Sequence, residues 1–217
     1  GKDGKLVTRQ GRHSATDLLC WPWRARAGIE SGTTIFFRWL RKFSRSNPSA
    51  DPAQAEAHYQ FGREMIEQAE PARAVTCFRR AIELDPAHRD AHIDLASTML
   101  GFGNAEAAEA SARAALALDA RSTAAWVNLG AALEGRGRFA EAADAYRAAI
   151  AVDPDCIPAL ANLAAVCLRQ DALDEAERSI ERVLRLSPGY AEAHLRRGNI
   201  LLERRLAARA AESFREA

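Results

Sequence analysis

Apolar residues recur at helical spacing along most of the chain, in pairs of short runs. The clearest pair is WVNLGAALEGRGRFAEAADAYRAAIAVDP, from Trp126 to Pro154. Steps of three and four residues place the apolar side chains on one face of each of two helices, which a short turn joins. The residues expected to face inwards are Trp126, Leu129, Gly130, Leu133, Ala142, Tyr146 and Ala149. The pattern therefore predicts a helical hairpin whose apolar face must be covered by a neighbour, with Trp126 as a core residue.

The same pattern returns in both directions at a fixed period of about 34 residues. The predicted units span residues 55–88, 89–122, 123–156, 157–190 and 191–217, and the last unit is truncated. A fixed period of this length is typical of solenoids, in which each unit buries its apolar face against the next. There is no strand pattern, so we expect an all-α array over residues 51–217.

The first 50 residues form a separate, basic segment. They carry ten Lys or Arg against three acids, whereas residues 51–217 carry twenty Arg, no Lys and twenty-six acids. We expect residues 1–34 to be loosely ordered and residues 33–45, TTIFFRWLRKFSR, to form an amphipathic helix with apolar and cationic faces. These residues would cap the first unit, remain disordered, or lie as a helix at a membrane surface or in a partner's groove. The acidic balance of the array argues against nucleic acid as a partner.

Residues that could carry catalysis or bind metal lack the spacing that either role requires. There is no GxSxG, P-loop or HExxH motif. His58, His92 and His194 lie multiples of the repeat length apart, so they occupy equivalent places in separate units and cannot share an ion. The four cysteines form no CxxC pair, which favours free thiols in a reducing cytoplasm. We therefore predict no enzymatic activity, no cofactor and no metal for this segment.

These repeats resemble the tetratricopeptide repeat (TPR) family. The shared features are a large residue followed by Leu-Gly in the first helix, a small–aromatic–small pattern in the second, and a terminal Pro. The resemblance covers about residues 55–217 and implies a right-handed superhelical solenoid of about five helix pairs. It also implies that the first helix of each pair lines a concave groove for an extended peptide or partner protein. Arg197 departs from the family, which prefers Leu there, and puts the packing of the fifth unit in doubt.

Polar side chains are expected to line this groove. Asparagine amides donate and accept at once, so stacked asparagines can hold the backbone of an extended peptide, or alternatively only hydrate the groove. Small Ala131 and Ala165 leave room for that backbone. We expect these groove residues to be solvated, so that their removal affects binding and not stability. The candidate peptide-binding residues are Tyr59, Gln60, Arg63, Asp94, Ser97, Asn128, Asn162, Arg196 and Asn199.

Three functions follow as expectations. The first is a non-catalytic, cytoplasmic protein-interaction module or scaffold. The second follows from Asn-Leu-Gly and Asn-Leu-Ala at residues 128–130 and 162–164, which are similar to the arrays of O-linked N-acetylglucosamine transferases and related bacterial proteins. That similarity implies a substrate-presenting arm of a larger transferase. The third is a membrane-adjacent scaffold held by residues 33–45.

Overall fold

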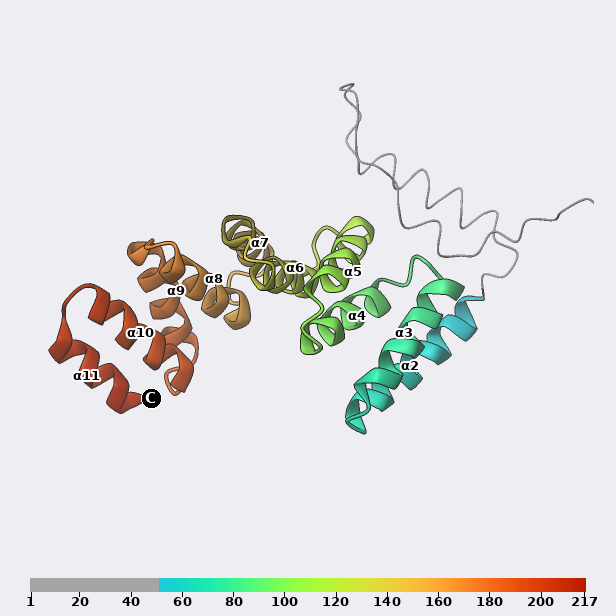
Figure 1. Cartoon of the computed structure of the whole chain (residues 1–217), viewed down its shortest axis with the longest axis horizontal. Helices are drawn as coiled ribbons and strands as arrows, with labels where there is room; N and C mark the ends of the chain where they lie inside the picture. Colours follow the sequence, from blue (N-terminus) through green and yellow to red (C-terminus); the bar gives the residue numbers. More distant parts are fainter. Residues whose placement is uncertain (1–50) are drawn as a thin grey trace, which may run out of the picture. The chain divides into compact units, whose positions relative to one another are not determined.

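The computed structural model describes residues 51–217, and the predictions for residues 1–50, including the amphipathic helix at 33–45, lie outside the described residues. The described part consists of ten α-helices in five consecutive pairs (Figure 1). The first helices of the pairs are α2 (Pro52–Glu67), α4 (Arg89–Gly101), α6 (Thr123–Gly135), α8 (Ile157–Arg169) and α10 (Ala191–Glu203). The second helices are α3 (Pro71–Leu84), α5 (Ala105–Leu118), α7 (Phe139–Val152), α9 (Leu173–Leu186) and α11 (Ala207–Glu216).

The helix boundaries keep the period of the sequence with one exception. Every second helix begins one repeat length after the previous second helix, and the first helices do the same from α4 onwards. Helix α2 begins at Pro52, earlier than the predicted start at residue 55. The Asp51 side chain accepts hydrogen bonds of 3.1 Å from the backbone N–H groups of Ala53 and Gln54, and proline is favoured at the first helical position. This cap adds a turn that the repeat pattern does not contain.

The turn inside every pair depends on one residue in the left-handed region. Ala69, Gly103, Gly137, Asp171 and Arg205 follow one another at intervals of one repeat length, with φ values of 58°, 70°, 73°, 59° and 59°. Glycine adopts this region without steric cost, whereas residues with a Cβ are strained there. The turn geometry is therefore kept in all five units, although only two of them have glycine at this position.

Within a pair, the two helices approach closely because small residues face large ones. A Cβ added to Gly130 would lie 2.7 Å from Cδ1 of Tyr146, which is fully buried. Gly62 faces Phe78 and Gly198 faces Phe214 in the same way. In the second unit the buried Ala112 stands where the first and third units have these rings. The tight approach thus needs a glycine only where an aromatic ring fills the space opposite.

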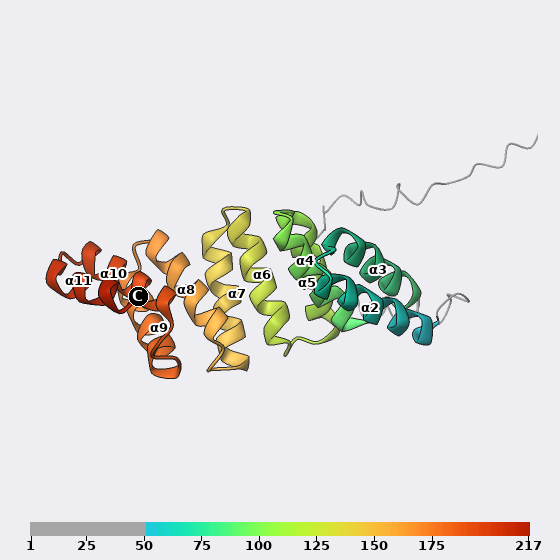
Figure 2. The ribbon, with the colours of Figure 1, turned by 90° about the horizontal axis from the view of Figure 1, so that it is seen from below.

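Successive pairs stack side by side along the array (Figure 2). Each second helix packs on the next first helix, and α4, α6, α8 and α10 also contact one another in sequence. No comparable contacts join consecutive second helices in residues 51–217. The first helices therefore form the inner row of the stack and the second helices the outer row. The prediction of an all-α repeat solenoid is confirmed.

Trp126 is only half-buried, contrary to the prediction that it is a core residue. Its Nε1–H donates a 2.9 Å hydrogen bond to the carbonyl of Ala120, in the turn that enters the unit. His92 and His194 occupy the equivalent position, and their Nε2 atoms lie 3.2 and 2.7 Å from the carbonyls of Pro86 and Pro188. Burial lowers the pKa of His92, which favours the neutral ring. This position thus ties the entering turn to the first helix in three units.

Arg197 joins the two helices of the fifth pair. Its Nε donates a 2.8 Å hydrogen bond to the hydroxyl of Ser213, which is buried, and its Nη2 lies 2.5 Å from Glu216. The residue that departs from the family pattern therefore makes polar contacts from α10 to α11 in place of apolar packing.

Candidate peptide-binding face

The nine predicted binding residues all lie on first helices, which form the inner row. We call the solvent-facing surface of α2, α4, α6, α8 and α10 the inner face. Gln60, Arg63, Ser97 and Asn199 are exposed on it, Asp94, Asn128, Asn162 and Arg196 are half-buried, and Tyr59 is buried. The side chains therefore differ in how far a ligand could reach them.

Tyr59 is a supporting residue and not a surface contact, which corrects the prediction. Its ring centroid lies 6.0 Å from that of Phe78 and 4.7 Å from that of His88. Burial, followed by the charge of Asp94 and a hydrogen bond to it, raises the pKa of Tyr59 to about 12. The hydroxyl therefore stays protonated and directs its hydrogen towards Asp94 on the next first helix.

Asn128 and Asn162 do not make equivalent contacts, although the sequence suggested that the two stacked asparagines act alike. Nδ2 of Asn128 donates a 3.1 Å hydrogen bond to the backbone carbonyl of Ile93, so it joins α6 to α4. Asn162 lies instead beside the Tyr146 hydroxyl, which donates to Glu134 at 3.3 Å and whose pKa is raised mainly by burial. Asn128 therefore contributes to the contact between units and keeps its Oδ1 and one Nδ2–H for a ligand. This bond argues against the expectation that removal of Asn128 leaves stability unchanged.

Two other predicted residues are engaged within their own helices. Nε2 of Gln60 donates to Glu56 at 2.7 Å, and Nη2 of Arg196 donates to Glu192 at 2.5 Å. Both are exposed contacts between residues one helical turn apart, which contribute only a few tenths of a kcal/mol, about 0.2–0.5. A ligand could therefore displace either of them at small cost.

A hollow of about 500 Å³ opens between the first two units. It arises where α2 and α4 lie without the close contact that joins the later first helices. The hollow unites three predicted residues, Arg63, Asp94 and Ser97, whereas Asn128, Asn162, Arg196 and Asn199 belong to later helices. Its lining is Arg63, Ile66, Glu67, Pro71, Asp94, Ser97, Thr98, Gly101 and Phe102. We call this space the α2–α4 hollow.

Sequence reasoning missed the apolar part of the hollow. Ile66 and Phe102 line it, with 44% and 51% of their surfaces exposed. A signal was present for Phe102, because the equivalent positions of the other units are all polar. Those residues are Gln68, Arg136, Gln170 and Arg204. Phe102 and Ile66 together expose apolar surface in one hollow, and exposed apolar patches mark interaction sites.

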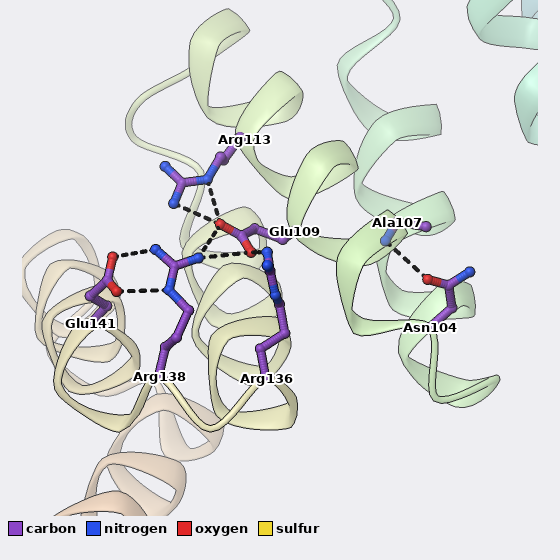
Figure 3. Close-up of polar contacts among 7 residues, drawn as sticks. All are labelled: Asn104, Ala107, Glu109, Arg113, Arg136, Arg138 and Glu141. Carbon is purple, nitrogen blue, oxygen red and sulfur yellow. Dashed lines mark hydrogen bonds and ion pairs between the residues drawn. The ribbon is translucent and has the colours of Figure 1, made fainter. Parts of the chain in front are cut away.

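A second polar cluster lies away from the hollow, around Glu109 of α5 (Figure 3). Glu109 is 6% exposed, and its carboxylate accepts hydrogen bonds from Arg113 of the same helix, at 2.8 Å from Nη2, and from Arg138, at 2.8 Å from Nη1. Arg136 bonds it as well. Since Arg136 and Arg138 flank the turn between α6 and α7, the cluster ties the second unit to the third. It was not predicted, because nothing in the sequence shows that the three cations converge.

The described residues contain no group of three or more His, Cys, Asp or Glu that could hold a metal ion. Cys77, Cys156 and Cys167 are free. Burial raises the pKa of Cys167 to about 11, which keeps its sulfur protonated. No helix in residues 51–217 combines the length and apolarity that a bilayer crossing demands.

Several solved structures are similar to the described fold. The crystal structure of MamA matches 71% of this chain and 91% of its own, at 22% identity and a TM-score of 0.66. YrrB, a TPR protein with an unusual peptide-binding site, matches 82% of this chain and 89% of its own, at 18% identity and a TM-score of 0.63. The first TPR of Spaghetti (RPAP3), bound to the HSP90 peptide SRMEEVD, matches 58% and 99%, at 21% identity and a TM-score of 0.56.

Family models give the same result at the level of sequence. No curated protein matches the chain. Three models described as tetratricopeptide repeat match residues 65–133, 123–156 and 163–217, and together they cover more than half of the chain. With five helix pairs at a constant period, and a left-handed turn residue at the same place in each, the chain belongs to the tetratricopeptide repeat family.

Proposed function

We propose that the array binds an extended segment of a partner protein along its inner face, and that the α2–α4 hollow receives one side chain of that segment. The observation that carries the proposal is the hollow itself. It brings exposed apolar, hydroxyl and charged groups together at a place where the units leave a gap of about 500 Å³. Ligand sites are concave and mostly apolar, with a few polar groups that fix orientation.

The rest of the inner face suits the backbone of such a segment. Ala131 and Ala165 are small and half-buried on α6 and α8, so a backbone can approach there. Oδ1 of Asn128 is available to accept from a peptide N–H, because its Nδ2 already bonds Ile93. Two similar proteins, YrrB and RPAP3, are peptide binders by their own descriptions, which supports the same class of function here.

The test is selection of peptides from a random twelve-residue library on the full chain. Selected peptides are then measured by fluorescence anisotropy against a blocking variant, Ser97→Trp, which places an indole in the hollow. Ser97 is exposed, so the substitution should leave the fold intact, as circular dichroism can verify. We expect at least tenfold weaker binding, the equivalent of about 1.4 kcal/mol.

The matched control is Ala140→Trp, which adds the same side chain to an exposed position of the outer helix α7. It should leave affinity within about twofold, since surface substitutions away from a site have small effects. Peptides that bind both variants like the unmodified chain would place the ligand elsewhere and refute the proposal.

The substrate-presenting arm of a transferase stays a second prediction. It is supported by Asn128 and Asn162 on one inner face, in the motifs that suggested it. Its test adds peptides from glycosylated proteins, together with shuffled versions of them, to the library and measures which are enriched. An enrichment no greater than that of shuffled sequences would leave the general binding function as the only one supported.

A further inference from the structure

Acidic groups dominate the surroundings of the α2–α4 hollow. Glu67 and Asp94 line it, against the single cation Arg63. Asp90 lies one turn from Asp94 on α4, and its charge reaches the same Tyr59 hydroxyl. Residues 51–217 as a whole also carry more acids than bases, with twenty-six Asp or Glu against twenty Arg.

Asp94 is held in this acidic setting without a direct counter-ion. It is half-buried, and no Lys, Arg or His of residues 51–217 lies within 4.0 Å of its carboxylate. Burial raises the pKa of Asp94, opposed by the Tyr59 hydrogen bond and by the charge of Arg63. The contrast is Glu109, which is buried and bonded by three guanidinium groups. A partly desolvated carboxylate with no paired cation favours a ligand that brings one.

The apolar groups of the hollow stand beside these acids. Phe102 and Ile66 are each about half exposed, one from each unit. Large exposed apolar side chains next to unpaired carboxylates are complementary to a segment that carries apolar and cationic residues together. An acidic ligand, such as the HSP90 peptide SRMEEVD that the first TPR of RPAP3 binds, would instead bring its charge towards Glu67 and Asp94.

We propose that the ligand is a basic amphipathic segment, with one large apolar side chain between Ile66 and Phe102 and a Lys or Arg paired with Asp94. This inference rests on the proposed function, because it assigns the chemical class of the peptide that the inner face binds. The pairing gives Asp94 the counter-ion that residues 51–217 do not supply. The apolar side chain removes Phe102 and Ile66 from water at the same time.

The test uses three fluorescent twelve-residue probes and the full chain. The first probe contains four Leu and four Lys among Ser and Gly, and the other two replace every Lys with Glu or with Ser. We expect the Lys probe to bind about ten times more tightly than the Ser probe and the Glu probe to bind most weakly. Asp94→Asn should weaken the Lys probe about three- to tenfold and change the Ser probe less than twofold, since a partly buried ion pair is lost only in the first case.

Matched controls separate a local effect from a general one. Glu203→Gln alters the residue of α10 that is equivalent to Glu67, and Leu202→Gln alters the one equivalent to Ile66. Both should leave the Lys probe within twofold, whereas Glu67→Gln and Ile66→Gln should weaken it. A Glu probe that binds as well as the Lys probe, no binding of the Lys probe, or an unchanged affinity in Asp94→Asn would each overturn the inference. Library peptides that remain sensitive to Ser97→Trp would then show that the proposed function stands while the assigned peptide class does not.

Discussion

Glu109 provides the strongest test of how the units are coupled. Its carboxylate receives five hydrogen bonds from Arg113, Arg136 and Arg138, and it is 6% exposed (Figure 3). Two of the three arginines belong to the next unit. Removal of this carboxylate should therefore weaken the contact between the second and third units and leave each hairpin intact.

The expected loss of stability follows from how deeply the Glu109 carboxylate and its arginine partners are buried. Breaking a fully buried ion pair costs about 3–5 kcal/mol, and an exposed pair contributes about 0–1 kcal/mol. Here the carboxylate is buried, but the arginine side chains are 54%, 40% and 33% exposed, so water can solvate them once the carboxylate is gone. We expect Glu109→Ala to lower the free energy of unfolding by about 2–3 kcal/mol, between the two limits.

The same cluster predicts a dependence on pH. Burial alone would raise the pKa of Glu109, but the hydrogen bonds from the three arginines outweigh it and hold the pKa below its ordinary value of 4.5. A folded-state pKa below the unfolded value means that the unfolded chain binds the proton more readily, so stability falls as pH falls. The difference between the unmodified chain and Glu109→Gln should thus be constant above about pH 5 and shrink below pH 4.5.

The assay is urea unfolding followed by circular dichroism, combined with hydrogen exchange of α5 and α6. The control is Glu177→Ala, at the equivalent position two units along, where a half-buried carboxylate lies 3.0 Å from Arg204 alone. That control should cost less than about 1 kcal/mol. If Glu109→Ala costs no more than Glu177→Ala, and exchange at the α5–α6 contact is unchanged, the carboxylate does not couple the units.

Three further predictions concern the packing of the array. Gly130→Ala should lower the free energy of unfolding by about 1–2 kcal/mol in urea titrations, because overpacking against Tyr146 outweighs the helix preference of alanine. A more stable variant would show that the Tyr146 ring can move aside. Ala69→Gly should raise the melting temperature and contribute about 0.5–1 kcal/mol, because it relieves a φ of 58°, and a lower melting temperature would argue against that strain. Asn128→Ala should cost about 1 kcal/mol in thermal unfolding and Asn162→Ala less, since only Asn128 bonds a neighbouring unit's backbone; equal losses would contradict that assignment.

Repetition explains why most of the fold could be predicted from the sequence. The constant repeat length specifies the helix pairs, and the separation of Gly130 from Tyr146 recurs between Gly62 and Phe78. The period cannot specify features that occur once. The Asp51 cap lengthens α2 before the first unit, and the half-burial of Trp126 depends on a carbonyl in the preceding turn.

The candidate site was predictable only in part, for a similar reason. Spacing alone places Arg63, Asp94 and Ser97 on the inner face, and the structure brings them into one hollow. It could not show that Tyr59 turns inwards against Phe78, or that Asn128 bonds the carbonyl of Ile93, because both depend on the distance between neighbouring helices. The lack of close contact between α2 and α4, where the hollow lies, has no counterpart in the repeat pattern.

The most direct test of the central claim is amide NMR mapping of the full chain with a library-selected peptide. Binding along the inner face predicts the largest shift changes on α2 and α4 around Arg63, Ser97 and Phe102, with smaller changes on α6 and α8. The same changes should disappear in Ser97→Trp. Changes confined to the outer helices α5 and α7, or an undiminished response in that variant, would contradict peptide binding in the α2–α4 hollow.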